Sequence, residues 1–379
     1  MPRPSHSSVV LVSLLTPPGR GALAVVGVTG DGAAALVDRV FAARGGRAVA
    51  DREDGAIAFG TWRTTGEELV VVRRRGDVVE VHCHGGVAAA AAIVASLVRF
   101  GAEEVPWPRW LTAAGESETV VEAHEALARA GGPRAARILA RQAAGALDAE
   151  LARIEAFRAG GDHQAADAAC DRLLRAARVG LRLTRPWRVV VAGAVNAGKS
   201  SLVNALAGHA RSIVSAEPGT TRDLVETRVV LDGWEVDLVD TAGLRHDAET
   251  AGATERAGIA RAEAAARNAD LVLRVGPASQ GPPPITPDDV LVASKTDLAA
   301  IAASWPANAL STSAATGAGI GDLAARIVAC LVPEDRAEPD LLAGAVPFTP
   351  SQVATVERMA DRVAFVPGVP RLPPGACMR

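Results

Sequence analysis

The segment that most constrains the fold of this chain is a glycine-containing loop at residues 193–200, Gly-Ala-Val-Asn-Ala-Gly-Lys-Ser, which matches the pattern GxxxxGK[ST]. An apolar, strand-like segment at 188–192 precedes it. The segment that follows has helical periodicity and a possible stop at Gly208, and its apolar face carries Leu202, Val203 and Leu206. From Pro186 onward strands and helices alternate, which is typical of a parallel sheet with crossover helices. The pattern therefore predicts a phosphate-binding loop (P-loop) in an α/β domain.

The residue types of this loop suit phosphate binding. Its glycines let backbone N–H groups wrap the phosphates at a helix N-terminus. Lys199 is expected to reach the β- and γ-phosphate oxygens and to serve catalysis, and the Ser200 hydroxyl is expected to bind magnesium. A chance match is the alternative, and the flanking strand and helix argue against it. The expected nucleotide contacts here are Gly193, Asn196, Ala197, Gly198, Lys199, Ser200 and Ser201.

Lysine usage points to the same loop. Of the 40 basic residues only Lys199 and Lys295 are lysine, and each lies in a short motif that a GTP-binding domain needs. Arginine replaces lysine easily on a solvated surface, but its larger planar guanidinium does not fit where a compact ammonium enters a phosphate loop. The two lysines therefore indicate positions where the geometry is required.

Two further motifs follow in the order that a GTPase requires. Residues 219–223, Gly-Thr-Thr-Arg-Asp, contain Thr220, a candidate nucleotide contact, and Thr221, a candidate catalytic residue and magnesium ligand. A strand pair turning at Asp232-Gly233 then leads to Asp-Thr-Ala-Gly at 240–243. There Asp240 is expected to hold a magnesium-bound water, and the Gly243 N–H to sense the γ-phosphate.

Base recognition is expected from Ser-Lys-Thr-Asp at 294–297, which follows an apolar strand at 290–293. The Asp297 carboxylate can accept hydrogen bonds from guanine N1–H and its amino group, which adenine does not offer. The aliphatic stem of Lys295 can lie over the base. A helix-capping turn is the alternative interpretation of this motif. The last guanine-contacting loop is expected at Ser313, Ala314 and Ala315.

Length and composition limit the remaining possibilities. A chain of 379 residues predicts two or three domains. Its formal charge of -3 offers no overall electrostatic reason to bind nucleic acid or membrane. The four cysteines are widely separated, and the apolar run at 86–98 is too short for a membrane span and is typical of a buried helix. We therefore expect a cytoplasmic protein without membrane association.

Outside the nucleotide motifs the chain divides by its patterns. Residues up to about 109 combine helical stretches with β-branched runs at 9–14, 23–28, 69–73 and 78–83, which predicts an α+β domain. Residues 119–179 predict two or three helices, and a last amphipathic segment is expected at 351–363. His82 and His84 share a strand face, where histidines that are each paired with a polar group or partly buried are expected rather than a metal site, since no third ligand is apparent. Residues 73–75, Arg-Arg-Arg, are read as a basic hairpin edge in preference to a phosphate contact.

The motif spellings resemble the MnmE (TrmE) family of tRNA-modification GTPases. The resemblance lies in the P-loop with its Asn196, in Gly-Thr-Thr-Arg-Asp at 219–223 and in Asp-Thr-Ala-Gly-Leu-Arg at 240–245. It extends to residues 16–26 and 79–86 near the N-terminus. It implies an α/β P-loop GTPase domain inserted in a helical domain and preceded by a small α+β N-terminal domain. The expected bounds are 1–110 for the N-terminal domain, 111–184 for the first helical part, 185–333 for the GTPase domain, and 334–379 for the helical remnant and tail.

The resemblance also implies a mechanism. Leu244 follows Gly243, so the glutamine that orients water in Ras-like enzymes is absent. Members of the family pair their GTPase domains around a potassium ion held by the P-loop asparagine, here Asn196, and use a glutamate of the second switch. Glu255 is the matching candidate, with a solvated helix charge as the alternative. The expected cofactors are GTP or GDP, Mg²⁺ and K⁺, in a homodimer formed through the N-terminal domain.

The family's function, as the resemblance implies, is modification of the tRNA wobble uridine with a flavin-dependent partner protein and a tetrahydrofolate derivative bound by the N-terminal domain. The chain departs from the family in three places. It ends Gly-Ala-Cys-Met-Arg, so that Cys377 lacks the expected Gly-Lys, and the segment 107–119 keeps little of the family pattern. Ser294 replaces the usual asparagine of the guanine motif, which is expected to weaken base affinity more than guanine selectivity.

These departures leave alternatives. A divergent paralogue could retain only a GTP-dependent regulatory switch without tRNA-modifying activity. An Era-like ribosome-associated GTPase shares the same motifs, but it predicts an RNA-binding domain after the GTPase domain, where the acidic remainder after Pro333 offers none.

Overall fold

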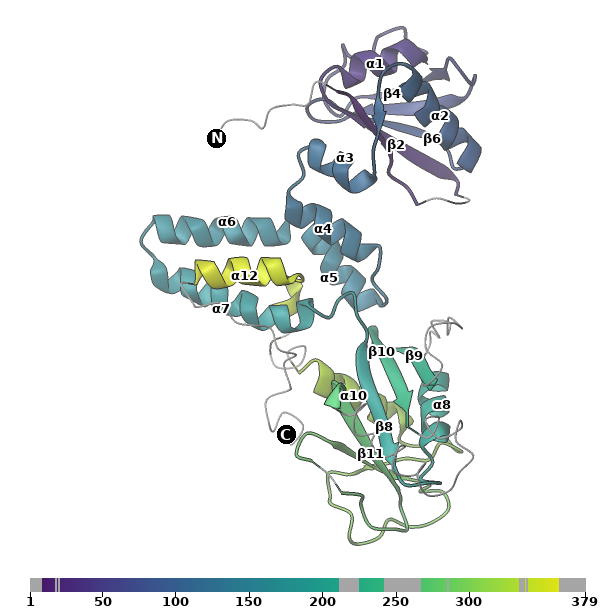
Figure 1. Ribbon diagram of the computed structural model, residues 1–379, viewed down its shortest axis with the longest axis vertical. Helices are drawn as coiled ribbons and strands as arrows, with labels where there is room; N and C mark the ends of the chain where they lie inside the picture. The colour runs from purple at the N-terminus through teal and green to yellow at the C-terminus, as the bar shows by residue number, and fades with distance from the viewer. Residues whose placement is uncertain are drawn as a thin grey trace, which may run out of the picture. The chain divides into compact units, whose positions relative to one another are not determined.

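The computed structural model describes residues 9–17, 19, 21–210, 225–241, 267–284, 286–333, 338 and 340–360. The chain divides into two compact units, residues 1–125 and residues 126–379. Each unit is built around its own β-sheet, and their elements are labelled in Figure 1.

The first unit contains a seven-stranded sheet in the order β3-β4-β5-β6-β2-β1-β7. Its strands pair antiparallel except for β1 and β7, which are parallel. The four β-branched runs predicted from the sequence are confirmed as strands, whereas β3, β4 and β7 were not predicted. The strands are β1 (Leu11–Leu14), β2 (Leu23–Thr29), β3 (Phe41–Ala43), β4 (Ile57–Trp62), β5 (Glu68–Arg73), β6 (Val78–His84) and β7 (Glu103–Glu104).

Two helices cover one face of this sheet, α1 (Ala33–Val40) and α2 (Val87–Arg99) (Figure 1). The expected helix at 86–98 is therefore present. Its residues Ile93 and Leu97 are fully buried in a core with Val79 and Val81 of β6. A short helix, α3 (Trp107–Ala113), packs Trp110 directly over Gly27, where a Cβ atom would lie 2.5 Å from the indole ring.

Helices dominate the chain from 118 to 180, and there are four of them rather than the two or three expected. They are α4 (Glu118–Leu127), α5 (Pro133–Ala143), α6 (Ala146–Ala159) and α7 (His163–Gly180). The apolar spacing of Leu139, Ala143 and Leu147 runs across the break between α5 and α6, where Gly145 has φ 86°. A residue in the left-handed conformation ends a helix, and the periodicity of apolar residues alone does not reveal such a break.

The chain returns to these helices near its C-terminal end. The amphipathic segment expected at 351–363 forms α12 (Pro350–Met359), which lies beside α6 and α7 (Figure 1). Val356 is fully buried with Leu147 and Ile154 of α6 and Leu173 of α7. The buried Gln142 side chain donates to the carbonyl of Gly344 and accepts from the N–H of Val346. A 3₁₀ turn, η2 (Leu341–Ala343), lies just before.

The second unit also contains a six-stranded sheet in the order β13-β12-β11-β8-β10-β9. All neighbouring pairs are parallel except β9 with β10, which form the hairpin predicted at Asp232-Gly233. The strands are β8 (Trp187–Gly193), β9 (Val225–Leu231), β10 (Trp234–Asp240), β11 (Leu271–Pro277), β12 (Val290–Ser294) and β13 (Leu310–Ser311). Two helices of the described residues accompany this sheet, α8 (Lys199–His209) and α10 (Ile320–Leu331). Gly208 lies inside α8 rather than ending it.

The α5 helix meets the tip of the β9–β10 hairpin. The backbone N–H of Arg134 donates to the Gly233 carbonyl at 3.2 Å, and the guanidinium pairs with Asp232 at 2.6 Å. A Cβ atom on Gly132 would lie 2.5 Å from the same carbonyl. The hairpin and the first turn of α5 therefore pack at a distance that only glycine allows. Among the described residues, no helix has the length and apolarity needed to cross a membrane.

Candidate functional site

The P-loop joins the carboxyl end of β8 to the first turn of α8, as the sequence predicts. Asn196 and Gly198 both have positive φ, 61° and 89°. A Cβ atom on Gly193 would lie 2.2 Å from the carbonyl oxygen of Val275 on β11, so this position excludes any side chain. Leu202 and Leu206 of α8 are buried, which anchors the helix against the sheet. The loop is thus a tight turn between two anchored elements, with its N–H groups at a helix N-terminus.

Lys199 lies across this loop. Its ammonium donates to the carbonyls of Gly193 at 3.0 Å and Ala194 at 2.8 Å, and the residue is only 5% exposed. A lysine with its charge held at the mouth of a P-loop is placed to meet phosphate oxygens. An arginine would have to fit its larger fork into the same space.

Ser200 and Asp240 meet between α8 and β10. The Ser200 hydroxyl donates to the Asp240 carboxylate, and Asp240 is 5% exposed. Asp240 ends β10, which pairs in parallel with β8, so both groups lie at the same edge of the sheet as the P-loop. A hydroxyl and a carboxylate are the oxygen ligands that a hard divalent cation prefers, so this pair suits magnesium.

The two predicted guanine-contacting loops lie together. The Ser313 hydroxyl donates to the Asp297 carboxylate at 2.6 Å, and the Thr296 N–H donates to the Thr312 carbonyl at 3.2 Å. Lys295 has φ 59° and its ammonium donates to the Asn196 carbonyl of the P-loop at 2.7 Å. Ala314 and Ala315 follow Ser313, and Ala315 is exposed. The Asp297 carboxylate, which the sequence predicts as the guanine contact, is therefore oriented by a neighbouring hydroxyl, a contact that motif spacing did not reveal.

Ser294 contributes a link that the sequence motifs did not predict. The residue is buried, and its hydroxyl lies 2.6 Å from the carbonyl oxygen of Ala197 and 3.1 Å from that of Gly276. The only signal in the sequence is its place directly before Lys295. Four other predicted site residues, Thr220, Thr221, Gly243 and Glu255, lie outside the described residues.

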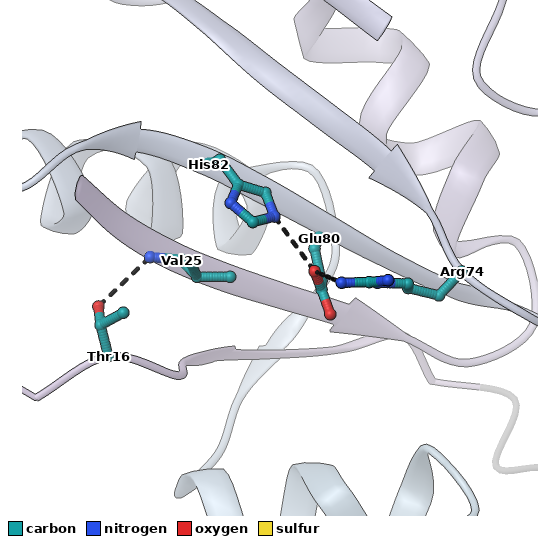
Figure 2. Close-up of polar contacts among 5 residues, drawn as sticks. All are labelled: Thr16, Val25, Arg74, Glu80 and His82. Atoms are coloured by element: carbon teal, nitrogen blue, oxygen red, sulfur yellow. Dashed lines mark hydrogen bonds and ion pairs between the residues drawn. The ribbon is translucent and has the colours of Figure 1, made fainter. Parts of the chain in front are cut away.

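Polar residues of the first unit form a separate group on the open face of its sheet (Figure 2). Glu80 accepts from Arg74 at 2.8 Å and lies 3.1 Å from the His82 imidazole, while His84 lies 2.7 Å from Glu67. The expectation of paired strand histidines is confirmed. In the part of the chain that the structure describes, no group of three or more His, Cys, Asp or Glu side chains could hold a metal ion.

Sequence comparisons identify related proteins. A family model described as "50S ribosome-binding GTPase" matches residues 188–300. The chain is 38% identical over 318 residues to the tRNA modification GTPase MnmE of Acidiphilium cryptum, covering 75% of this chain and 71% of that protein. It is 33% identical to the MnmE of Heliobacterium modesticaldum, over 70% of this chain and 65% of that relative. It is 30% identical to the MnmE of Chlamydia abortus, over 83% of this chain and 79% of that relative.

A comparison with solved structures finds the cytosolic domain of the T. maritima FeoB iron transporter in its GDP form. The sequence identity is 24%, and the match covers 38% of this chain and 62% of that one with a TM-score of 0.26. Likeness at this level supports no further conclusion.

Proposed function

Because this chain belongs to the MnmE family of tRNA modification GTPases, we propose that its GTP hydrolysis serves modification of the tRNA wobble uridine. The chain itself binds and hydrolyses GTP, as its family and the GTPase match at 188–300 establish. The tRNA part of the proposal rests on the family; the observation that supports the GTP part is the meeting of P-loop, Ser200–Asp240 pair and expected guanine loops at one edge of the second sheet. The regulatory-switch alternative is not favoured, since relatives of 30–38% identity over most of the chain are all named as tRNA modification GTPases.

The proposed domain plan is a GTPase domain at 185–333 inserted between helical segments at 111–184 and 334–379, behind an N-terminal domain at 1–110. Support comes from α12, whose Val356 packs with α6 and α7 although the whole GTPase sheet intervenes in sequence. The Gln142 side chain forms hydrogen bonds with the backbone of Gly344 and Val346, where the chain returns to the helices. An inserted domain of this kind has both of its chain ends tied to one helical body.

For hydrolysis we propose that Lys199 and the P-loop N–H groups bind the β- and γ-phosphates, while Ser200, Thr221 and Asp240 hold magnesium. The ion would neutralise charge that develops on the phosphate oxygens. The protein's own part is positioning: Lys199 is held by two loop carbonyls, and Asp240 by the β10 strand. Asp297, oriented by Ser313, selects guanine by accepting two hydrogen bonds.

We further propose that hydrolysis is stimulated by potassium. Asn196 is the proposed potassium ligand and Glu255 the residue that positions the attacking water. Support for Asn196 is its exposed side chain on a loop backbone held at φ 61°. An amide oxygen is a suitable ligand for a monovalent cation, and the fixed backbone limits the directions that the side chain can take.

The open face of the first sheet is proposed as the surface of a homodimer. Register places Ile57 and Phe59 of β4 and Leu23 of β2 on this face, and their exposed fractions are 67%, 42% and 64%. Large exposed apolar side chains on the part of this face that α3 leaves uncovered favour association with another copy. The tetrahydrofolate derivative is proposed to bind beside Glu80 and His82. Their polar groups, with Val25 and Val70 on either side of His82, suit a flat ring that forms hydrogen bonds. A flavin-dependent protein and tRNA are the proposed partners.

Two measurements test the proposed function. The first is GTP hydrolysis in potassium against sodium buffer, with nucleotide affinity recorded in parallel; equal rates in both salts contradict the proposed role of Asn196. The second is nucleoside analysis of tRNA from a strain that lacks the gene and is complemented with wild type or Lys199→Ala. Restoration of the modified wobble uridine by wild type alone is expected, and an unchanged modification level in the deletion strain excludes the proposal.

A further inference from the structure

We propose that one side of the helices α5 and α7 binds the phosphate backbone of tRNA. This arginine surface consists of Arg134, Arg137 and Arg141 of α5 with Arg172, Arg175 and Arg178 of α7. The identification of the nucleic acid as tRNA rests on the proposed function, whereas the surface itself rests on the placement of charge. It lies outside the GTP site.

Positive charge is concentrated in these two segments. The whole chain carries 40 basic and 43 acidic residues, so its small negative net charge does not reveal the local distribution. Residues 126–147 contain four arginines and no Asp or Glu, and residues 172–188 contain six arginines and no Asp or Glu. Cations clustered on one surface attract a polyanion even when the net charge of the protein is negative.

Both helices direct their arginines away from the hydrophobic core. The three arginines of α5 are spaced by three and four residues and therefore share one side of the helix. The opposite side of α5 is buried through Ala135, Ile138, Leu139 and Gln142. The three arginines of α7 are spaced by three residues, opposite the buried Leu173, Ala176 and Ala177. Each helix therefore presents a row of guanidinium groups.

The two rows of arginines meet at the η2 turn. The Arg141 guanidinium donates to the Leu342 carbonyl at 2.8 Å, and the Arg172 guanidinium donates to the Asp340 carbonyl at 3.0 Å. These carbonyls are two residues apart, so α5 and α7 bring their arginines to one short stretch of backbone. A guanidinium carries five N–H donors, so a single bond to a carbonyl leaves others for a phosphate.

Neighbouring acidic groups do not cancel the charge of this surface. Acidic residues at its edges are Asp171, Asp232, Glu338 and Asp340. The Arg175–Glu338 pair is 3.1 Å long, with side chains 52% and 50% exposed, and such a solvated pair is weak enough to be exchanged for a phosphate. Arg137 is exposed and forms no ion pair or hydrogen bond with another described residue.

The exposed side chains favour a nucleic acid over a membrane or a protein partner. The large apolar side chains that are exposed among the described residues all lie outside residues 126–185. A helix on a membrane surface needs such side chains for insertion, and the core of a protein interface is enriched in them. Phosphate recognition needs guanidinium groups, which bind phosphate oxygens through paired N–H donors.

The test measures binding of the full chain to a transcript of a tRNA with uridine at the wobble position, over a series of salt concentrations. The variants are Arg137→Glu, Arg137→Lys and the double variant Arg137→Glu/Arg175→Gln. Arg99→Glu is the matched control, because it replaces an exposed arginine at the end of α2 that also has no partner among the described residues. GDP affinity and thermal unfolding are recorded for each variant.

We expect the double variant to bind the transcript about tenfold more weakly than wild type at about 0.1 M salt. The slope of log affinity against log salt concentration should decrease by about 2, because two phosphate contacts are lost. Arg137→Glu should decrease the slope by about 1, whereas Arg137→Lys and Arg99→Glu should bind as wild type does. GDP affinity should be the same in all of them.

The proposal is overturned if wild type does not bind the transcript at about 50 mM salt, or if the double variant keeps the affinity and salt dependence of wild type. Equal weakening by Arg99→Glu would contradict it too, because net charge and not this surface would then determine binding. If polyglutamate competes as well as unlabelled transcript, the surface serves an acidic protein and the assignment to tRNA is wrong. If the double variant does not fold, Arg137→Glu carries the test, since that side chain makes no polar contact with the described residues. Transcript binding through this surface, together with an unchanged wobble uridine in the deletion strain, would refute the proposed function and leave the surface in place.

Discussion

The two β-sheets of this chain differ in which part of a strand is available for chemistry. In β6 of the first unit, Val79 and Val81 are fully buried while the alternating Glu80 and His82 remain partly exposed. In β12 of the second unit every residue is buried. An antiparallel sheet covered by helices on one side can present side chains from its open face, whereas a parallel sheet buried on both faces presents only its strand ends.

This difference explains where the candidate groups lie. In the second unit Gly193, Asp240 and Ser294 are the last residues of β8, β10 and β12. Parallel strands bring their carboxyl ends to one edge, so three motifs far apart in sequence meet there. In the first unit the polar residues lie along a strand face and pair with one another. The comparison teaches that the candidate functional groups lie at strand ends in the second unit and on a strand face in the first.

Lys199→Ala should have the largest effect of the substitutions considered, and the affected quantity is the GTP hydrolysis rate of the second unit. Loss of the ammonium at the P-loop is expected to lower the GTP hydrolysis rate about a hundredfold or more. A preorganised positive charge that stabilises the negative charge developing on the phosphates contributes on this scale. His82→Ala on the open face of the first sheet is the control and should leave GDP affinity unchanged. A steady-state hydrolysis assay and a nucleotide titration make the comparison. Normal hydrolysis by Lys199→Ala would break the assignment of the strand-end site.

Asp297→Asn should alter base choice at the same edge. The amide offers one acceptor and one donor, so the hydrogen bonds to guanine N1–H and the amino group are no longer both accepted. We expect GTP affinity to fall about a hundredfold, given two lost hydrogen bonds to a charged acceptor, and xanthosine triphosphate to become the better ligand. Competition binding with both nucleotides checks this. Retained preference for GTP would mean that another residue reads the base.

A matched pair of valine substitutions sharpens the contrast in burial. Val292→Thr places a hydroxyl in the fully buried β12 and should destabilise the second unit by about 2 kcal/mol. Val70→Thr on the partly exposed face of β5 should cost less than about 0.5 kcal/mol. Calorimetry resolves the two units, because added GDP raises only the transition of the second. Equal effects of the two substitutions would refute the difference between the sheets.

Glu235→Gln should have the smallest effect, and only in a limited pH range. Burial raises the pKa of Glu235; nearby Asp237 raises it too, while Arg228 opposes the shift. The folded state then binds more protons than the unfolded state, so wild-type stability falls as pH rises from the ordinary glutamate pKa through the raised one. The glutamine variant should therefore gain in unfolding temperature, relative to wild type, across that interval and remain level above it. A difference that is constant from acid to neutral pH would contradict the raised pKa.

Much of the fold was predictable where local pattern and tertiary environment agree. The P-loop, its flanking strand and helix, the Asp232-Gly233 hairpin and the four β-branched runs all formed as expected. The predictions of helix bounds failed where a single glycine acted differently from what the spacing of apolar residues indicated. Gly145 breaks the apolar spacing that runs from Leu139 into α6, and Gly208 continues α8 to His209. The strand β4 was missed because Gly60 interrupts it and its large apolar residues, Phe59 and Trp62, do not belong to a β-branched run.

The sequence by itself determined the order of the nucleotide motifs, the choice of lysine at two positions and the acid proposed to read guanine, because these depend on residue type and local spacing. Only the tertiary structure decided how those motifs support one another. Ser313 orients Asp297, and Ser294 donates to Ala197 across 97 positions of sequence. Such contacts arise from strand order in the sheet, which sets β12 and the P-loop side by side through β11. The sequence around a serine in a strand does not indicate which distant carbonyl its hydroxyl will contact.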